Sequence, residues 1–274
     1  MSIFFKLFNK WLCKKDKAVA VNLIKHIAHI KKVSLVMTAY QEMGILKHLE
    51  ENCGEDFLIK VFLNNRFKNI NQPVLFDVGA NRGDFANILH GVFPNAIIHA
   101  FEPISSSYRL LKANCNHDNV ILNNVGLGFV SCKTEMYHYN DGFANQHASL
   151  YAEVLSEIHN QQKVVSEEIS INSIDDYCSM NGITTIDFLK IDTEGNELNV
   201  LKGAQRMINS NSINIIQFEF NEMNIISRVF LKDFYTILRG YEFYRLNTNE
   251  LLPLGKYKSI NEIFQFQNIV AIKK

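Results

Sequence analysis

Apolar residues from Val74 onward occur in two alternating arrangements, short continuous runs and longer segments spaced at helical intervals. Short apolar runs predict buried strands, and helical spacing predicts amphipathic helices. The runs place strands near residues 74–78, 96–101, 119–125, 186–191 and 213–220. The helical spacing places helices near residues 84–92, 105–115, 194–208 and 228–239. This alternation predicts an α/β fold, with a mostly parallel sheet covered by helices on both faces.

Two stretches depart from this alternation. Residues 128–175 contain short alternating runs and polar turns, which predict an inserted hairpin or meander near the mouth of a site. Residues 18–70 have the spacing of helices and carry no recognisable chemical motif. We therefore expect a helical N-terminal extension or cap over residues 1–70 and an α/β domain over residues 71–274.

The first predicted strand ends in a glycine turn that contains Asp77, Gly79 and Gly83. Glycines allow a backbone to approach a ligand closely, where a Cβ atom would collide with it. The second predicted strand ends in Glu102, and an acid at this place is suited to accept hydrogen bonds from ribose hydroxyls. The pattern predicts a site for a nucleoside.

The turn does not match the motifs that bind nucleotide phosphates. The G-x-G-x-x-G pattern of dinucleotide sites would place glycines where this chain has Asn81 and Asp84, and no G-K-[ST] occurs. Asp84 would also repel a pyrophosphate at the start of the following helix. An NAD-dependent oxidoreductase is therefore disfavoured. Asp77 and Asp84 suit a cationic ligand without phosphate, and S-adenosylmethionine fits that description.

Five segments, taken in order, resemble the FkbM family of S-adenosylmethionine-dependent methyltransferases. They are LFDVGANRGDFANIL, HAFEPISSSYRLLKAN, NNVGLG, SIDDYC and IDFLKIDTEGNELNVLKGA. The resemblance extends from about Pro73 to the end of the sequence. It implies a Rossmann-like class I fold whose seven-stranded sheet closes with the runs Tyr241–Leu246 and Phe264–Ile272. It also implies O-methyl transfer to a hydroxyl of a sugar, a glycan or a secondary metabolite.

The resemblance further implies which residues bind the cofactor. Gly79, Asn81 and Gly83 would line its methionine half, and Glu102 would bind the ribose. Asn124 or Val125 would lie near the adenine edge. Asp77 has two open interpretations, since it either contacts the ligand or orients the loop through backbone N–H groups.

Acidic residues at the ends of two later strands are the candidates for chemistry. Asp192 and Glu219 would face each other across the substrate, where a buried carboxylate can remove a hydroxyl proton. Alternatively, they could bind Mg²⁺ together with Asn221, because hard cations prefer oxygen ligands. His147, in the inserted stretch, is a further candidate base, although many loop histidines have no chemical role.

Composition adds constraints on partners and location. The chain has no net charge, yet residues 1–32 carry eight lysines and one acid. The remainder therefore has a net charge of −7. An acidic body argues against nucleic acid as a partner. Five cysteines without a C-x-x-C motif indicate free thiols in a reducing, cytoplasmic setting. The sequence makes no prediction about oligomeric state.

The N-terminal residues 1–17 have two interpretations. Phe4, Leu7, Phe8 and Trp11 share one helical face, and lysines lie on another. Such a basic amphipathic helix suits peripheral contact with a membrane. The alternative is a cap helix with solvated lysines, which we favour from the sequence alone.

Two other functional classes stay open beside O-methyl transfer. A module that binds the nucleoside without catalysis would keep Gly79 and Glu102 and show no turnover. An N-methyltransferase would act on an amine of a sugar or small molecule through the same site.

Overall fold

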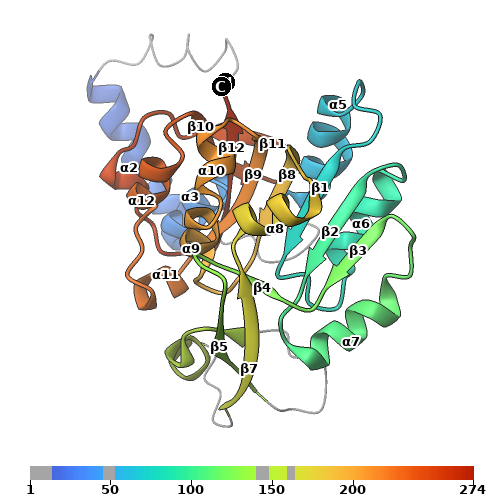
Figure 1. Ribbon diagram of the computed structural model, residues 1–274. Coiled ribbons are helices and arrows are strands. Elements are labelled where there is room, and N and C mark those ends of the chain that lie inside the picture. Colours follow the sequence, from blue (N-terminus) through green and yellow to red (C-terminus); the bar gives the residue numbers. More distant parts are fainter. Residues whose placement is uncertain (1–13, 46–52, 140–147, 159–163) are drawn as a thin grey trace. The chain divides into compact units, whose positions relative to one another are not determined.

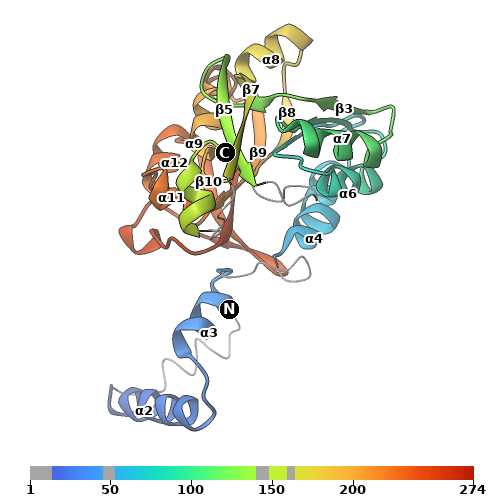
Figure 2. The ribbon, with the colours of Figure 1, turned by 90° about the horizontal axis from the view of Figure 1, so that it is seen from below.

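The computed structural model describes residues 14–45, 53–139, 148–158 and 164–274 (Figure 1). The chain divides into two compact units, Met1–Met43 and Gly44–Lys274, which are described separately here. In the first unit, α2 (Lys14–Ile30) is followed by α3 (Leu35–Glu42), which can be followed in Figure 2. The hydroxyl of Ser34 accepts a hydrogen bond from the Met37 backbone N–H and caps the start of α3. No helix in the described residues is long and apolar enough to cross a bilayer.

The second unit is built on an eight-stranded sheet with the order β11-β10-β12-β9-β8-β1-β2-β3. The five strands from β9 to β3 are parallel, and β12 is antiparallel to both of its neighbours. The strands are β1 (Val74–Val78), β2 (Ile97–Phe101), β3 (Val120–Asn123), β8 (Ile186–Ile191), β9 (Ile213–Phe220), β10 (Tyr241–Asn247), β11 (Glu250–Pro253) and β12 (Gln267–Lys273).

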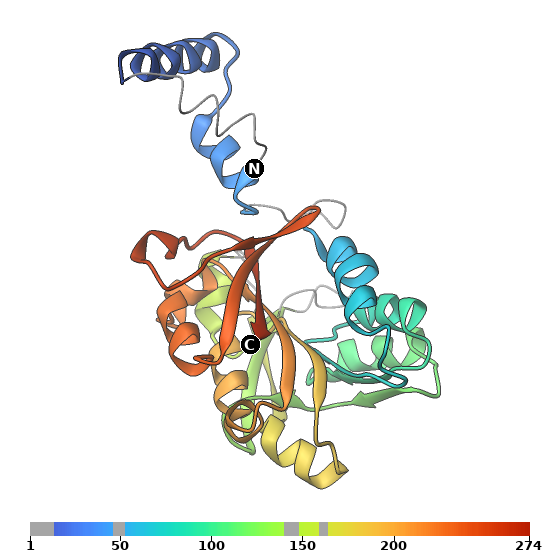
Figure 3. The same ribbon diagram turned by 90° about the horizontal axis from the view of Figure 1, so that it is seen from above.

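Helices cover both faces of this sheet, as Figure 3 shows. Successive strand residues point to opposite faces, so Phe76 and Leu189 pack on one side while Leu75 and Phe188 pack on the other. The first face packs on α8 (Ile174–Asn181), α9 (Glu197–Lys202), α10 (Gln205–Asn209) and α12 (Leu231–Ile237). The second face packs on η1 (Leu58–Leu63), α6 (Asp84–Val92) and α7 (Ser105–Asn114). Burial on both faces explains why the central strands read as continuous apolar runs.

The remaining helices are short. They are α4 (Glu55–Phe57), α5 (Asn64–Arg66), α11 (Met223–Ile226), η2 (Val154–Ile158) and η3 (Ser259–Asn261).

Residues 126–172 contain a second, four-stranded sheet with the order β4-β7-β5-β6. Its strands are β4 (Gly126–Leu127), β5 (Cys132–Tyr139), β6 (Ala148–Ser149) and β7 (Val164–Asn172). The antiparallel pair β5 and β7 forms a long two-stranded ribbon that extends away from the large sheet (Figure 1). This sheet occupies the stretch where the sequence predicts an insertion.

The α/β class and the strand order agree with the class I fold that the sequence predicts. The differences are local. A short strand, β11, adds an eighth member at the edge through a hairpin with β10. The helix expected over residues 194–208 is divided into α9 and α10 at Gly203, where the chain lies so close to the Gly128 carbonyl oxygen that a Cβ atom would be 1.9 Å from it.

The domain boundary at residue 70 stays a prediction, whereas the compact units separate between Met43 and Gly44. Leu58, Ile59 and Leu63 are fully buried in the same apolar cluster as Leu75 of β1. The helical segment η1 (Leu58–Leu63) therefore packs on the sheet as part of its core.

The turn after β1 is fixed by contacts with the two neighbouring strands. The backbone N–H groups of Gly79 and Ala80 both donate to the Phe101 carbonyl at the end of β2. Gly79 has a φ of 83°, and a Cβ atom there would lie 1.8 Å from the Asp192 carbonyl oxygen after β8. The glycine is thus required by the close approach of two protein backbones.

We expect Gly79→Ala to lower the free energy of unfolding by about 2–5 kcal/mol, from left-handed strain together with the clash on Asp192. Gly182→Ala is the matched control, since Gly182 has a φ of 66° and no atom within 4 Å of an added Cβ. That variant should lose only about 1–2 kcal/mol from strain. Urea denaturation of both variants measures the difference, and equal losses would contradict the backbone contact.

Candidate functional site

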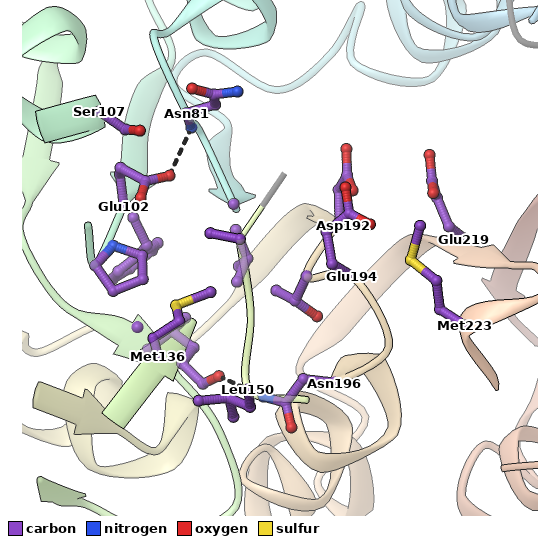
Figure 4. A pocket seen from close by; sticks show the side chains of 18 of the residues that line it. Asn81, Glu102, Ser107, Met136, Leu150, Asp192, Glu194, Asn196, Glu219 and Met223 are labelled. Atoms are coloured by element: carbon purple, nitrogen blue, oxygen red, sulfur yellow. Dashed lines mark hydrogen bonds between the residues drawn. The ribbon is translucent and has the colours of Figure 1, made fainter. Parts of the chain in front are cut away.

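A cavity of about 400 Å³ lies at the carboxyl ends of β1, β2, β8 and β9, as Figure 4 shows. This is the edge where ligands bind in parallel α/β sheets, and the size falls within the range of small-molecule sites. The second sheet contributes one wall through β5, β6 and β7. Of the residues predicted from the sequence, the cavity is lined by Gly79, Asn81, Glu102, Asp192, Glu219 and Asn221.

Glu102 and Asn81 form a polar corner on one side of the cavity (Figure 4). The Glu102 carboxylate accepts hydrogen bonds of 2.9 Å from the backbone N–H groups of Asn81 and Ile104. Burial raises the pKa of Glu102 to about 7, although these two bonds oppose the rise. The side-chain oxygen of Asn81 is buried and has no hydrogen-bond partner among the described residues. This corner therefore retains acceptor capacity for a bound ligand.

The loop after β8 is held by Glu197. One oxygen of its carboxylate accepts hydrogen bonds from Thr193 N, Thr193 Oγ1 and Gly195 N, at 3.0–3.1 Å. These bonds stabilise a turn in which Glu194 and Gly195 have φ values of 53° and 101°. The turn leaves Asp192 and Glu194 lining the cavity, where Figure 4 shows them beside Glu219.

Glu219 is the carboxylate most strongly affected by this environment. Burial, together with the negative charges of Asp192 and Glu194, raises its pKa well above the usual range. Its Oε2 accepts a hydrogen bond of 3.1 Å from the Asn221 side chain. A carboxylate with a raised pKa is suited to accept a proton near neutral pH.

Asp192 differs from Glu219 because a buried ammonium contacts it directly. Lys190 Nζ lies 3.2 Å from Asp192 Oδ2 and 3.7 Å from Asp77 Oδ1. It also lies 4.6 Å from the centre of the Phe85 ring. The sequence analysis did not identify Lys190, although strand alternation places it on the same face as Asp192.

Asp77 does not line the cavity. It is fully buried on β1, directly opposite Lys190 on β8, and burial raises its pKa to about 6. Neither of its oxygens has a hydrogen-bond partner among the described residues, so the interpretation that it holds backbone N–H groups is wrong. Its interaction is the ion pair with Lys190, and a role in cofactor binding stays a prediction.

Three other predicted cofactor residues also lie outside the cavity lining. Gly83 packs so closely on Cys115 that a Cβ atom would be 2.3 Å from the sulfur. The Asn124 amide donates to the carbonyl oxygens of Glu102 and Pro103. Val125 packs on the apolar core. Their contact with a cofactor stays a prediction, and the candidate base His147 lies outside the described residues.

The sequence analysis missed the apolar wall of the cavity. Residues of the second sheet and the segment after β6 supply it, namely Met136, Ala148, Leu150, Ile169 and Ile171. The alternation of apolar and polar residues along β7 indicates that one face is buried, but not what it faces. Ser149 connects this sheet to the site, because its hydroxyl donates to the Glu194 carbonyl at 2.8 Å.

The described residues do not support a metal site. No three His, Cys, Asp or Glu side chains among them group closely enough to hold an ion. Asn221, proposed as a third ligand, uses its amide nitrogen on Glu219 and its oxygen on the Met223 N–H. The Mg²⁺ alternative therefore has no structural support.

All the charged side chains in the described lining of the cavity are acidic. Its described lining contains five acidic residues and no lysine, arginine or histidine. The acids are Glu102, Asp192, Glu194, Glu219 and Glu222. Such a lining favours a cationic or hydroxyl-rich ligand and opposes a pyrophosphate.

Comparison with known proteins gives matches in sequence and in structure. A 31-O-demethyl-FK506 methyltransferase, FkbM, from Streptomyces tacrolimicus is 30% identical over 154 residues. That match covers 48% of this chain and 59% of the relative, so it leaves out more than a third of that protein.

The solved structures are more distant. A precorrin-6y C5,15-methyltransferase from Geobacter metallireducens GS-15 has a TM-score of 0.42 and 10% identity, covering 78% of this chain and 87% of that one. The METTL16 MTase domain has a TM-score of 0.45 and 9% identity, covering 85% and 75%. The fold assignment depends on the strand order of the sheet and not on these similarities.

A match to a protein-family model identifies the family of this chain. The model of the FkbM methyltransferase domain matches residues 77–243, well over half of the chain. This stretch includes the end of β1, Glu102, the loop after β8 and Glu219, all of which contribute to the cavity. The chain therefore belongs to the FkbM methyltransferase family.

Proposed function

We propose that the protein is an S-adenosylmethionine-dependent O-methyltransferase that acts on a hydroxyl of a sugar, a glycan or a secondary metabolite. The observation that carries the proposal is the cavity itself, in which a ribose-type corner and a pair of strand-end carboxylates occur together. Family membership supports methyl transfer, and the chemistry of the lining supports the cofactor and the acceptor.

The residues present fit S-adenosylmethionine. The buried acceptors of Glu102 and Asn81 suit ribose hydroxyls or an ammonium group. The apolar wall that includes Met136 and Leu150 suits a flat, weakly polar base. The acidic lining suits the positive sulfonium and ammonium groups. When bound, the cofactor supplies an electrophilic methyl group.

Glu219 and Asp192 would act on the acceptor. A neutral alcohol is a poor nucleophile, so a base must remove the hydroxyl proton as the new bond forms. Glu219 takes this role because its raised pKa makes it a stronger base than an ordinary carboxylate, and the hydrogen bond from Asn221 orients it. Asp192, paired with Lys190, would accept a hydrogen bond from a second acceptor hydroxyl and position the substrate.

The acceptor class is supported by one relative and one property of the site. The name of the Streptomyces tacrolimicus protein gives an O-demethylated compound as its substrate. In this chain, the carboxylates offer many acceptors to a polyhydroxyl surface. We infer from these two points that a hydroxyl is the methylated group.

Binding of the product-like ligand S-adenosylhomocysteine tests the cofactor. Isothermal titration should show binding to the wild-type protein and no response to NAD⁺. Glu102→Ala should weaken binding at least about tenfold, since hydrogen bonds to a charged group contribute about 1.5–3 kcal/mol. The matched control is Glu168→Gln, which changes an exposed acid paired with Lys133.

The same titration has an expected pH dependence. The pKa of Glu102 is raised to about 7, so its carboxyl is protonated below that pH and loses acceptor capacity. Affinity should rise from pH 6 to pH 8, and Glu102→Gln should remove this rise. A folded wild-type protein that does not bind S-adenosylhomocysteine would refute the proposed cofactor.

Glu219→Gln tests the base. We expect kcat to fall by about 10²–10⁴, the usual contribution of general base catalysis, while affinity for S-adenosylhomocysteine stays within about threefold. The wild-type rate should rise with pH through the raised pKa of Glu219, because the base must be ionised, and the variant should lack this rise. Glu168→Gln should keep the wild-type dependence of rate on pH. If Glu219→Gln also kept this dependence, the base would be another group.

An acceptor screen separates O-methyl from N-methyl transfer. Matched pairs of a sugar and its amino analogue should be incubated with labelled cofactor, and the products analysed by NMR. We expect the methyl group on oxygen. Methyl on nitrogen only would replace the proposal by N-methyl transfer, and binding without turnover across a broad screen would favour a non-catalytic module.

A further inference from the structure

Helix α2 in the first unit has an apolar face that is exposed. Val19, Leu23, Ile24, Ile27 and Ile30 are 50–65% exposed. Between residues 16 and 30, only Ala28 is buried. A helix of a globular domain normally buries such a stripe against a core. Within the described residues of the first unit, this face has no such cover.

The opposite side of α2 is polar and basic. Asn22, Lys25, His26 and His29 follow the i, i+3, i+4, i+7 spacing of one helical face. Lys31 and Lys32 follow at the end of the helix. The four polar residues within the helix and the apolar stripe therefore occupy different sides of α2.

Charge identifies what covers the apolar face. Residues 1–32 carry eight lysines and one acid. Pairing of α2 with the α2 of a second copy would bring two positively charged segments together, which opposes that arrangement. Nucleic acid would neutralise the lysines but leave Leu23, Ile24 and Ile27 in water. An anionic lipid surface satisfies both requirements, because headgroups attract lysines and acyl chains accept apolar side chains.

We propose that α2 lies in the surface of an anionic membrane, with Leu23, Ile24 and Ile27 among the acyl chains and Lys25 and Lys31 at the headgroups. The helix lies on the bilayer and does not cross it. Leu35, Val36 and Met37 at the start of α3 are apolar and exposed as well. This proposal does not depend on the proposed catalytic function.

Co-sedimentation of the full chain with vesicles tests the proposal. Vesicles of phosphatidylcholine and phosphatidylserine should bind at least about tenfold more protein than pure phosphatidylcholine, and salt should weaken the binding. Trp11 is the one tryptophan of the chain and precedes α2 by three residues. Its fluorescence should move to shorter wavelength as the protein binds.

Variants separate the two faces of α2. The triple variant Leu23→Gln, Ile24→Gln, Ile27→Gln keeps good helix formers and should lose vesicle binding. Lys25→Glu with Lys31→Glu should lose the preference for phosphatidylserine. Asn22→Gln, on the polar side, is the matched control and should bind like the wild type. An unchanged urea unfolding transition verifies that the second unit is intact in each variant.

Three results would overturn the proposal. In the first, the wild-type protein stays in the supernatant with phosphatidylserine vesicles. In the second, the triple variant binds as well as the wild type. In the third, light scattering shows a dimer that the triple variant converts to a monomer without any vesicle binding, which would make a second copy the occupant of this face.

Discussion

The buried ammonium of Lys190 is the interaction on which the rest of the site depends. Asp77 is fully buried in the middle of the sheet, and Asp192 lies at its edge. Lys190 lies between them and pairs with both. A carboxylate at the depth of Asp77 would be very costly without such a partner. The negative charges around Lys190 also raise its pKa, against the effect of burial, so the cation persists. One lysine therefore allows several acids to gather at the same strand ends.

This arrangement divides the acids of the cavity into different roles. The carboxylate of Glu197, beside the cavity, accepts hydrogen bonds from the backbone of a turn, and Asp192 is paired with a cation. Glu219 receives a hydrogen bond from Asn221 and the repulsion of its acidic neighbours, which the charge of Lys190 opposes in part. Chemically similar side chains thus differ in proton affinity because of where the chain places them.

The sequence predicts the parts of the site that depend on strand ends. Asp192, Glu102 and Glu219 follow apolar runs, so the parallel sheet brings them to one edge. Lys190 was not predicted because a single charged residue within an apolar run gives no sign of a partner. Its partner Asp77 is more than a hundred residues away in the sequence. The apolar wall was missed for a similar reason. Its pattern shows that a face is buried, but only tertiary structure shows that this face closes the cavity.

The second sheet shapes one side of the cavity separately from the large sheet. Its strands pair with one another, and β4 is its first member along the chain and, like β6, is only two residues long. The second sheet meets the loop after β8 through Ser149, whose hydroxyl donates to the carbonyl of Glu194. Substitutions on its apolar face, such as at Met136 or Ile169, would therefore reshape the pocket without disturbing the large sheet or Lys190. Under the proposed function, the fit of the acceptor could therefore be re-engineered on this wall while the acids at the strand ends stay unchanged.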